Sequence, residues 1–174
     1  AADNFEFKSA TIGGAKLNNH NLDWLLQHDQ IGARRPFQVV IMQGASFEAL
    51  TPESRQTFLS TTTSYAEKVR RAGAEPMLFM THAYVPPHIK ANKNMIEVVS
   101  NTYIDAGRAA NAKVIPVGLA FDLSYKTRPT FSLHADFDGT HPNLRGTYLG
   151  ACVVYLSLYD DDLTGLEYDY FKRL

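Results

Sequence analysis

Two side chains in the 136–143 loop are suited to acid–base chemistry, the carboxylate of Asp138 and the imidazole of His141. They are three positions apart, so the carboxylate can fold back onto the ring. A carboxylate on one ring nitrogen fixes the tautomer and stabilises the imidazolium, and the other nitrogen is then able to take a proton from a nucleophile. An Asp near a His is also common in turns with a local hydrogen bond, so the spacing alone leaves both interpretations open.

A helix is predicted directly after this loop and would hold it in place. Asn143 is a suitable N-cap for it. Apolar residues then recur at helical spacing, which predicts a helix over residues 144–158 with one face packed on the domain. These residues are Leu144, Tyr148, Leu149, Cys152, Val153 and Leu156. A catalytic pair is best held on a rigid element of this kind.

The rest of the chain alternates between predicted strands and predicted helices. Alternating or continuous apolar runs predict strands over residues 5–12, 37–42, 76–80 and 113–117. Apolar periodicity and capping residues predict helices over residues 18–27, 52–72 and 89–111. The alternation predicts an α/β fold, a three-layer α/β/α sandwich on a mostly parallel sheet. The tail, with Tyr168, Tyr170 and Phe171, is predicted to pack back on the domain.

Polar or glycine-rich segments follow the predicted strands. In parallel α/β sheets, ligands bind beyond the carboxyl ends of the strands. The segments expected there are Gly13 with Gly14, residues 43–46, Thr81 with His82, and the loop of Asp138 and His141. Independent segments that converge on one edge predict a catalytic or binding cleft. We expect His82 to line the substrate pocket of that cleft.

The composition limits the classes of function. The chain has 174 residues, 45% of them hydrophobic, which is enough apolar material for one domain with a core. A formal net charge of -1 argues against a nucleic-acid-binding or anionic-membrane-binding surface. No apolar run is long enough to span a bilayer, and no signal peptide is visible. The single cysteine gives neither a disulfide framework nor zinc-ligand spacing.

The order of these motifs resembles that of the SGNH (GDSL-type) hydrolases over nearly the whole chain. Asp-Gly-Thr-His-Pro-Asn at 138–143 resembles the family's last block, in which Asp and His complete a Ser-His-Asp triad. By that likeness Asp138 would orient His141, and His141 would act as the base. Residues 11–14 resemble the second block, whose glycine N–H helps to form the oxyanion hole, a role that would fall to Gly13 beside Gly14.

The sequence departs from the family pattern in two blocks. The opening block, a buried strand ending in Gly-Asp/Asn-Ser that carries the nucleophile, is absent from this sequence. The third block, usually Gly-x-Asn-Asp, reads Gln43-Gly44-Ala45-Ser46. Ala45 therefore stands where an Asn side chain would point into the oxyanion hole. Gln43 is a candidate substitute, and losing one such donor costs about 10²–10³ in rate.

The missing block has a structural consequence. In the flavodoxin-like strand order 2-1-3-4-5, the first strand is central. We therefore expect residues 1–174 to form a single SGNH-hydrolase-like domain that is incomplete at its N-terminus. An upstream segment, a cleaved piece that stays bound or a partner chain would fill the gap, because an unpaired inner edge splits the core. The alternative is a rearranged and shorter sheet.

The resemblance implies a serine hydrolase that acts on carboxylic esters, with an acetyl or short acyl group on a carbohydrate or lipid. It favours an extracytoplasmic bacterial setting. The expected partners are a small ester substrate and the completing segment, with no cofactor, no metal and no nucleic acid. A different class stays open, in which the chain is a non-catalytic descendant that serves as a binding or structural subunit.

Two alternative interpretations of single residues also stay open. Ser46 follows a buried strand and could be a nucleophile, but it lacks the Gly-x-Ser-x-Gly elbow and could equally cap a turn or line the cleft. His134, Asp136, Asp138 and His141 alternate in a way that could converge on a metal ion.

Overall fold

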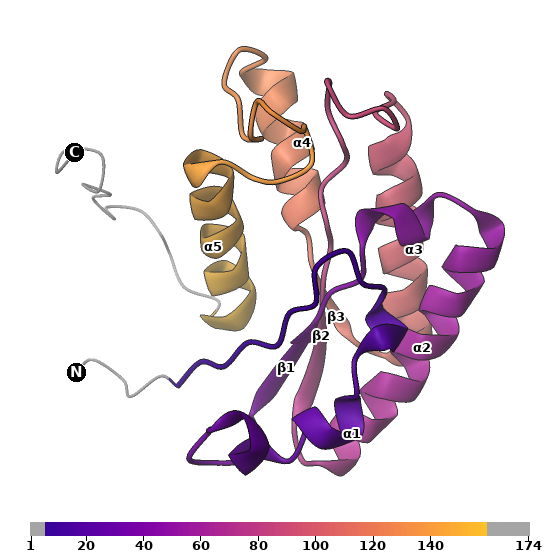
Figure 1. The fold of residues 1–174 in the computed structure, drawn as a ribbon, viewed down its shortest axis with the longest axis vertical. Coiled ribbons are helices and arrows are strands. Elements are labelled where there is room, and N and C mark those ends of the chain that lie inside the picture. Colours follow the sequence, from indigo (N-terminus) through magenta and orange to yellow (C-terminus); the bar gives the residue numbers. More distant parts are fainter. Residues whose placement is uncertain (1–5, 160–174) are drawn as a thin grey trace, which may run out of the picture.

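The computed structural model describes residues 6–159 and has three parallel strands with helices on both faces (Figure 1). The strands are β1 (Val39–Met42), β2 (Glu75–Phe79) and β3 (Lys113–Ile115). The α-helices are α1 (Leu22–Leu25), α2 (Pro52–Arg71), α3 (Met95–Ala110), α4 (Val117–Thr127) and α5 (Leu144–Tyr159). Short 3₁₀ helices are η1 (Leu17–Asn19), η2 (His28–Ile31) and η3 (Ser46–Ala49). The predicted fold class is confirmed, whereas the predicted packing of Tyr168, Tyr170 and Phe171 lies outside the described residues.

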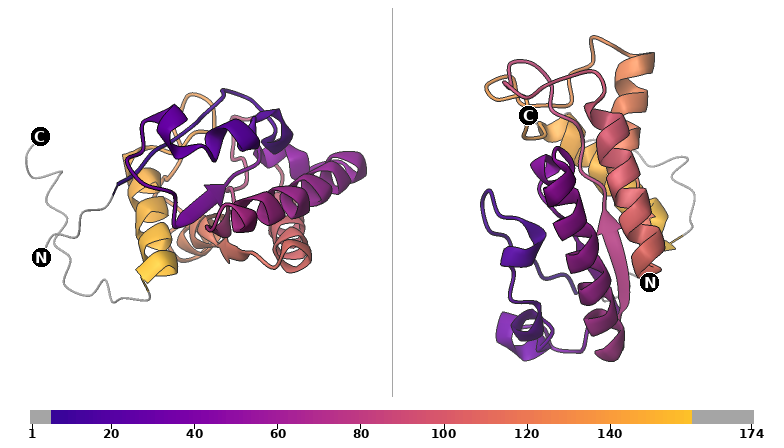
Figure 2. Two further views of the ribbon diagram at one scale, coloured as in Figure 1. Left: turned by 90° about the horizontal axis from the view of Figure 1, so that it is seen from below. Right: turned by 90° about the vertical axis from the view of Figure 1, so that its right-hand side faces the viewer.

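The sheet separates two apolar cores. Helices α2 and α3 pack on one face, and α4 and α5 pack on the other (Figures 1 and 2). Successive residues of β2 point to opposite faces, so Leu78 belongs to the α2–α3 core and Met77 to the α4–α5 core. A strand buried on both faces reads as a continuous apolar run, which is why β2 was recognisable in the sequence.

The strand order is β1-β2-β3, and all pairs are parallel. Val39 pairs with Glu75, and Met77 pairs with Lys113. Each connection runs through a helix on the same face, α2 between β1 and β2 and α3 between β2 and β3. The carboxyl ends of all three strands therefore meet at one end of the sheet.

Local signals explain where the long helices begin. Thr51 caps α2 by accepting the backbone N–H of Ser54 at 3.2 Å, and Pro52 occupies the first turn, as predicted. The predicted start of α3 near residue 89 is wrong, since the helix begins at Met95. The stretch before it forms turns, in which the Asn92 side chain accepts the N–H of Asn94 at 3.0 Å.

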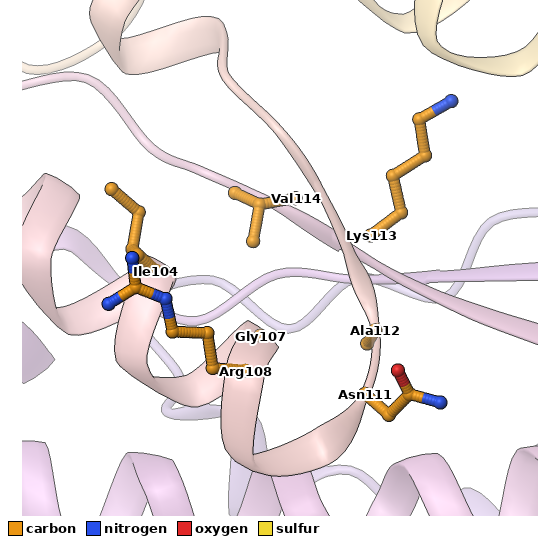
Figure 3. Close-up of a pocket in the computed structure, with 7 residues that line it drawn as sticks. All are labelled: Ile104, Gly107, Arg108, Asn111, Ala112, Lys113 and Val114. Carbon is orange, nitrogen blue, oxygen red and sulfur yellow. The ribbon is translucent and has the colours of Figure 1, made fainter.

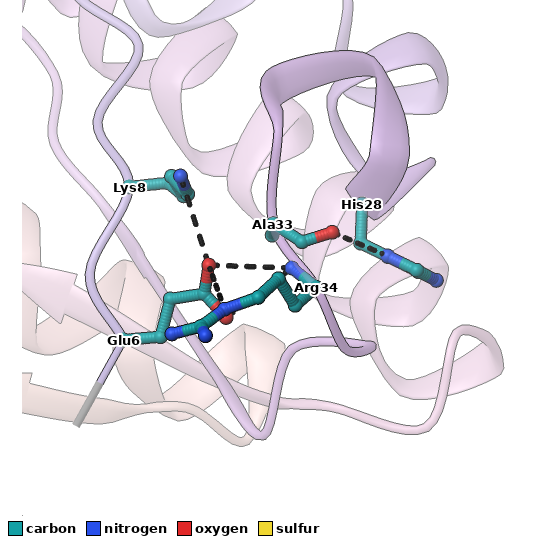
Figure 4. A network of polar contacts seen from close by, with 5 residues as sticks. All are labelled: Glu6, Lys8, His28, Ala33 and Arg34. Carbon is teal, nitrogen blue, oxygen red and sulfur yellow. Dashed lines mark hydrogen bonds and ion pairs between the residues drawn. The ribbon is translucent and has the colours of Figure 1, made fainter. Parts of the chain in front are cut away.

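The strand predicted over residues 5–12 is wrong for its described part, because residues 6–12 form no strand. Alternating side chains favour an extended chain, but a strand also needs a neighbour with which to pair. Contacts of the Glu6 carboxylate hold this segment instead (Figure 4). The carboxylate accepts the backbone N–H of Arg34 at 3.2 Å, and it lies 3.6 Å from Lys8 Nζ. The helix predicted over residues 18–27 is likewise split into η1 and α1 by the extended His20.

One edge of β1 is unpaired within residues 6–159, since β1 pairs only with β2. Its sequence is entirely apolar, and Ile41 is 38% exposed. An exposed apolar edge offers a row of N–H and C=O groups to another strand.

The apolar face predicted for the helix after the loop is only partly correct. Leu149 and Val153 pack on the α4–α5 core, but Leu144 is 53% and Leu156 is 42% exposed. The fully buried positions of α5 are Gly146 and Gly150. A Cβ on Gly146 would lie 2.2 Å from the Leu133 carbonyl oxygen, so the helix backbone itself packs there. Counting large apolar residues alone missed this glycine stripe.

No helix among residues 6–159 combines the length and the apolar character needed to cross a membrane.

Candidate functional site

Asp138 and His141 form the pair that their spacing predicted. The His141 ring donates from Nδ1 to Asp138 Oδ2, and Asp138 Oδ1 accepts the N–H groups of Thr140 at 2.9 Å and of His141 at 3.0 Å. Partial burial raises the pKa of Asp138, but these hydrogen bonds outweigh it and lower the pKa to about 2. The aspartate is therefore ionised at neutral pH and fixes His141 as the Nδ1–H tautomer.

His141 directs its other nitrogen outward. Its side chain is 73% exposed, and among residues 6–159 its ring has no hydrogen-bond partner besides Asp138. A neutral imidazole of this tautomer has a free lone pair on Nε2. The pair can thus take a proton from a hydroxyl that approaches Nε2 of His141.

The loop around this pair is fixed at both ends. Ala135 donates its N–H to the His141 carbonyl at 2.8 Å, and His134 and Pro142 form a short antiparallel bridge. Asn143 caps α5, as predicted, by accepting the N–H groups of Arg145 at 2.9 Å and of Gly146 at 3.1 Å. The loop therefore cannot shift without breaking the helix cap.

Three segments distant in sequence meet beside the pair at the carboxyl end of the sheet (Figure 1). The Tyr84 hydroxyl forms hydrogen bonds with the side chains of Thr140 and Ser46 and with the backbone of Phe47. Ser46 also donates to the His82 carbonyl at 3.2 Å. The ends of β1 and β2 and the loop of Asp138 and His141 are thus joined through Tyr84. No hydrogen bond between Ser46 and His141 occurs within residues 6–159, and the expected place of Ser46 in a cleft stays a prediction.

His82 belongs to a buried histidine pair. Its Nδ1 lies 3.1 Å from Nε2 of His134, and its ring stacks on Phe121 with a centroid distance of 4.6 Å. His134 is 2% exposed, and its Nδ1 lies 2.7 Å from the Tyr125 hydroxyl. Burial, followed by the nearby His134, lowers the pKa of His82 to about 4. His82 is therefore neutral at pH 7, and its expected place in a substrate pocket stays a prediction.

Buried side chains form hydrogen bonds with the backbone of the loop of residues 43–46. Gly44 donates its N–H to the Tyr103 hydroxyl at 3.1 Å and accepts that hydroxyl's proton at 3.2 Å. The N–H of Ala45 goes to the buried Glu48 carboxylate at 2.8 Å. Ala45 therefore has no side-chain donor for a substrate, and its backbone N–H is already bonded to Glu48. Gln43 is exposed, and its side chain makes no hydrogen bond within the described part of the chain.

Gly13 and Gly14 form an exposed turn in which Ala15 donates its N–H to the Ile12 carbonyl at 3.2 Å. Gly14 has φ 67°, a conformation that favours glycine. The turn is tied to the 43–46 loop indirectly, since Glu48 also accepts the N–H of Leu17 at 3.1 Å. No contact between the two glycines and the Asp138–His141 pair occurs among the described residues.

One hollow lies away from the Asp138–His141 pair. It has a volume of about 400 Å³ and is located where α3 turns into β3, at the amino ends of the strands (Figure 3). Its lining residues are Ile104, Gly107, Arg108, Asn111, Ala112, Lys113 and Val114. Because ligands of α/β sheets bind at the carboxyl ends, this hollow is not the candidate site.

Among the described residues, the side chains of the 134–141 segment do not come together as metal ligands. In the part of the chain that the structure describes, no three His, Cys, Asp or Glu side chains lie close enough to hold an ion. His134 faces His82 and Tyr125, whereas Asp138 faces His141.

The sequence interpretation missed Tyr84, Tyr125 and His134 as parts of the site. Tyr84 and Tyr125 lack any motif, and their roles depend on contacts across elements. His134 had a signal, its position just before the Asp138 loop, but it was considered only as a metal ligand.

No protein-family model matches the chain, and no curated protein matches it. Solved structures do match. A protein from Slackia heliotrinireducens described as a candidate SGNH hydrolase aligns with a TM-score of 0.66 and 23% identity, covering 83% of this chain and 80% of that chain.

Two further solved structures share the fold. An acetyl xylan esterase aligns with a TM-score of 0.55 and 16% identity, over 84% of this chain and 77% of its own. A GDSL-like lipase from Parabacteroides merdae aligns with a TM-score of 0.61 and 13% identity, over 83% of this chain and 68% of its own. At these identities the likeness concerns the fold, and it confirms that the fold is that of the SGNH hydrolases.

Proposed function

We propose, from the SGNH-type fold and its site, that this chain supplies the histidine and aspartate of a serine hydrolase acting on carboxylic esters. The observation that carries the proposal is the Asp138–His141 pair. Asp138 holds the ring by Nδ1, and the 73% exposed side chain leaves Nε2 accessible at the carboxyl end of the sheet. A base in this state is suited to activate a hydroxyl nucleophile.

The reaction would proceed in two steps. A serine hydroxyl attacks the acyl carbon while His141 Nε2 takes its proton, and the imidazolium returns that proton to the leaving alcohol. Water then attacks the acyl-enzyme with His141 again as the base, which releases the carboxylic acid and restores the serine. Asp138 stabilises the imidazolium in both steps. Backbone N–H of Gly13 and the Gln43 side chain are the proposed donors to the oxyanion.

The serine would come from a strand that pairs with the free edge of β1. That edge is apolar, parallel to β2 and unpaired within residues 6–159. A parallel strand added there would end beside residues 43–46, at the same end of the sheet as His141. A covalently continuous upstream segment and a bound separate chain satisfy this geometry equally.

We propose an acetyl or short acyl group on a carbohydrate or lipid as the substrate class. Support comes from proteins of the same fold, one named as an acetyl xylan esterase and another as a GDSL-like lipase. Both names describe cleavage of esters between a carboxylic acid and an alcohol, the bond that the proposed triad would attack.

The test has two parts. Intact mass spectrometry under denaturing conditions first identifies everything that co-purifies with the chain, and a fluorophosphonate probe then labels activated serines. The proposal expects the label on a serine outside residues 1–174, lost when His141→Ala is introduced. A folded chain of 19.4 kDa that is alone and unlabelled would refute the serine-hydrolase mechanism.

A second candidate function is supported by the 43–46 loop. Ala45 has no side-chain donor, and Glu48 occupies its N–H at 2.8 Å, so the third-block contribution to an oxyanion hole is lost. The chain would then be a non-catalytic subunit that retains the fold for binding or assembly. Labelling discriminates the two functions, because such a subunit gives a completing segment without an activated serine.

A further inference from the structure

A continuous chain of hydrogen bonds leads from the loop before α5 to His82. The N–H of Leu133 donates to the Tyr125 hydroxyl at 3.0 Å, and that hydroxyl lies 2.7 Å from Nδ1 of His134. On its other side, Nε2 of His134 lies 3.1 Å from both the Ala83 carbonyl oxygen and Nδ1 of His82.

The carbonyl of Ala83 fixes the protons along this chain. A carbonyl oxygen only accepts, and the ring atom seen at 3.1 Å from it is Nε2 of His134, so this arrangement assigns the proton to that nitrogen. In neutral His134 the Nδ1 then bears a lone pair, and the Tyr125 hydroxyl donates to it. The Nε2–H of His134 points between the Ala83 oxygen and Nδ1 of His82, which must also bear a lone pair. His82 is therefore the Nε2–H tautomer.

The Nε2–H of His82 faces accessible space. No hydrogen bond from Nε2 of His82 is seen within residues 6–159, where the ring's polar contacts are His134 and the Ala83 backbone. This nitrogen is not among the buried polar atoms without a partner in that range, which are Thr62 Oγ1 and Thr81 Oγ1. Stacking on Phe121 and an edge contact with His134 fix the plane of the ring. The N–H is thus a pre-oriented donor whose position does not depend on a bound ligand.

His82 lies at the same end of the sheet as the proposed catalytic pair, since it follows the carboxyl end of β2. Ser46, at the end of β1, donates to the His82 carbonyl at 3.2 Å. His82 is close enough to His141 for the charge on His141 to lower the pKa of His82. The position that lacks a donor, Ala45, immediately precedes Ser46.

We propose that the Nε2–H of His82 is a further catalytic donor to the acyl oxygen of the ester, beside the proposed donors Gly13 and Gln43, with His134 and Tyr125 as positioning residues. This inference rests on the proposed hydrolase function. The donor stabilises the negative charge that develops on the acyl oxygen when the serine attacks. No proton is transferred from His82, which hydrogen-bonds the oxyanion and returns unchanged.

A neutral donor suits this position for an electrostatic reason. His141 becomes an imidazolium during the reaction, and a second cation beside it would be repelled. Burial and the proton on His134 Nε2 keep His82 neutral, with a pKa of about 4. The carboxylate of Asp138 remains paired with His141.

The first experiment is long-range ¹H–¹⁵N NMR at pH 7 on the ¹⁵N-labelled protein, isolated together with everything that co-purifies with it. We expect His82 and His134 both as Nε2–H tautomers and His141 as the Nδ1–H tautomer. A proton on Nδ1 of His82, or a doubly protonated His82, would overturn the assignment. This measurement needs neither the serine nor an ester.

The second experiment measures hydrolysis of p-nitrophenyl acetate by the protein isolated together with the segment that supplies the serine. We expect His82→Leu to lower kcat by about 10²-fold with little change in KM, since the donor acts on the transition state. His82→Gln restores part of the rate because its amide also donates. Tyr125→Phe lowers kcat less, and the control His20→Gln leaves it unchanged.

The outcomes separate this inference from the proposed function. Hydrolysis by the unaltered protein with an unchanged kcat in His82→Leu would overturn the donor role alone. Absence of hydrolysis in the unaltered protein would overturn the hydrolase proposal and the catalytic role together. In that case the NMR experiment still decides whether His82 is the neutral, outward-facing donor.

Discussion

Gly139 and Val85 touch through their backbones. The N–H of Val85 donates to the Gly139 carbonyl at 2.9 Å, and a Cβ on Gly139 would lie 2.0 Å from the Val85 carbonyl oxygen. Gly139 also has φ 64°, a region that disfavours residues with a side chain. This contact joins the loop of Asp138 and His141 to the segment after β2.

Gly139→Ala is therefore expected to disturb this loop. The free energy of unfolding should fall by about 3 kcal/mol, from backbone strain and the clash together. Gly73→Ala is the matched control, since Gly73 has φ 82° but nothing within 4 Å of its Cβ position. The control should lose about 1 kcal/mol, from strain alone. Urea denaturation of both variants measures the difference, and equal losses would contradict a backbone contact at Gly139.

Much of this fold follows from signals that are local in sequence. The cap at Thr51, the cap at Asn143 and the continuous apolar run of β2 each need only their neighbours along the chain. The same holds for Asp138 and His141, whose pairing depends on a short loop. Patterns of this kind are predictable because the residues that interact are also close together in the sequence.

The predictions that failed concern features that depend on contacts between residues far apart in the sequence. Residues 6–12 alternate like a strand but lack a strand to pair with, and α5 buries glycines instead of the leucines at its predicted face. The roles of Tyr84 and Tyr125 depend on partners from other elements. Only the packed fold brings these together, so no spacing rule could have identified them.

Tyr84→Phe is expected to loosen the loop of Asp138 and His141. The variant loses the hydroxyl that bonds to Ser46, Thr140 and the Phe47 backbone, at a cost of about 1 kcal/mol. Hydrogen exchange of the Val85 N–H should accelerate about three- to tenfold, since its acceptor Gly139 lies in that loop.

Tyr65→Phe serves as the control for this change. It removes a hydroxyl that donates to the His20 carbonyl at 2.7 Å, away from the loop. Its stability should fall similarly while exchange at Val85 stays unchanged. If both variants accelerate exchange at Val85 equally, the effect reports general loss of stability and the bridging role of Tyr84 is refuted.

The lowered pKa of Asp138 predicts that the protein loses stability in acid. Its pKa is about 2 when folded, against an ordinary value of 3.8, so the folded state binds this proton less readily than the unfolded state. The stabilisation is fully present above pH 4 and is lost as the pH falls from about 4 to 2. Asp138→Asn should flatten the stability profile in this window. Chemical denaturation at several pH values measures it, and an unchanged slope would contradict the lowered pKa.

The lowered pKa of His82 predicts a separate loss of stability on acidification, which begins at a higher pH than the loss due to Asp138. Its pKa falls from the ordinary 6.5 to about 4 in the folded protein, so the unfolded state takes up the proton first. Stability should therefore be complete above about pH 6.5 and decline by about 2–3 kcal/mol as the pH falls toward 4. His82→Gln removes this titration and should flatten the decline, whereas His20→Gln should leave it in place. Burial lowers the pKa of His134 as well, so part of the decline should remain in His82→Gln. A decline that is undiminished in His82→Gln would mean that His82 is not the buried neutral imidazole, and would remove the electrostatic basis for its role as a donor beside His141.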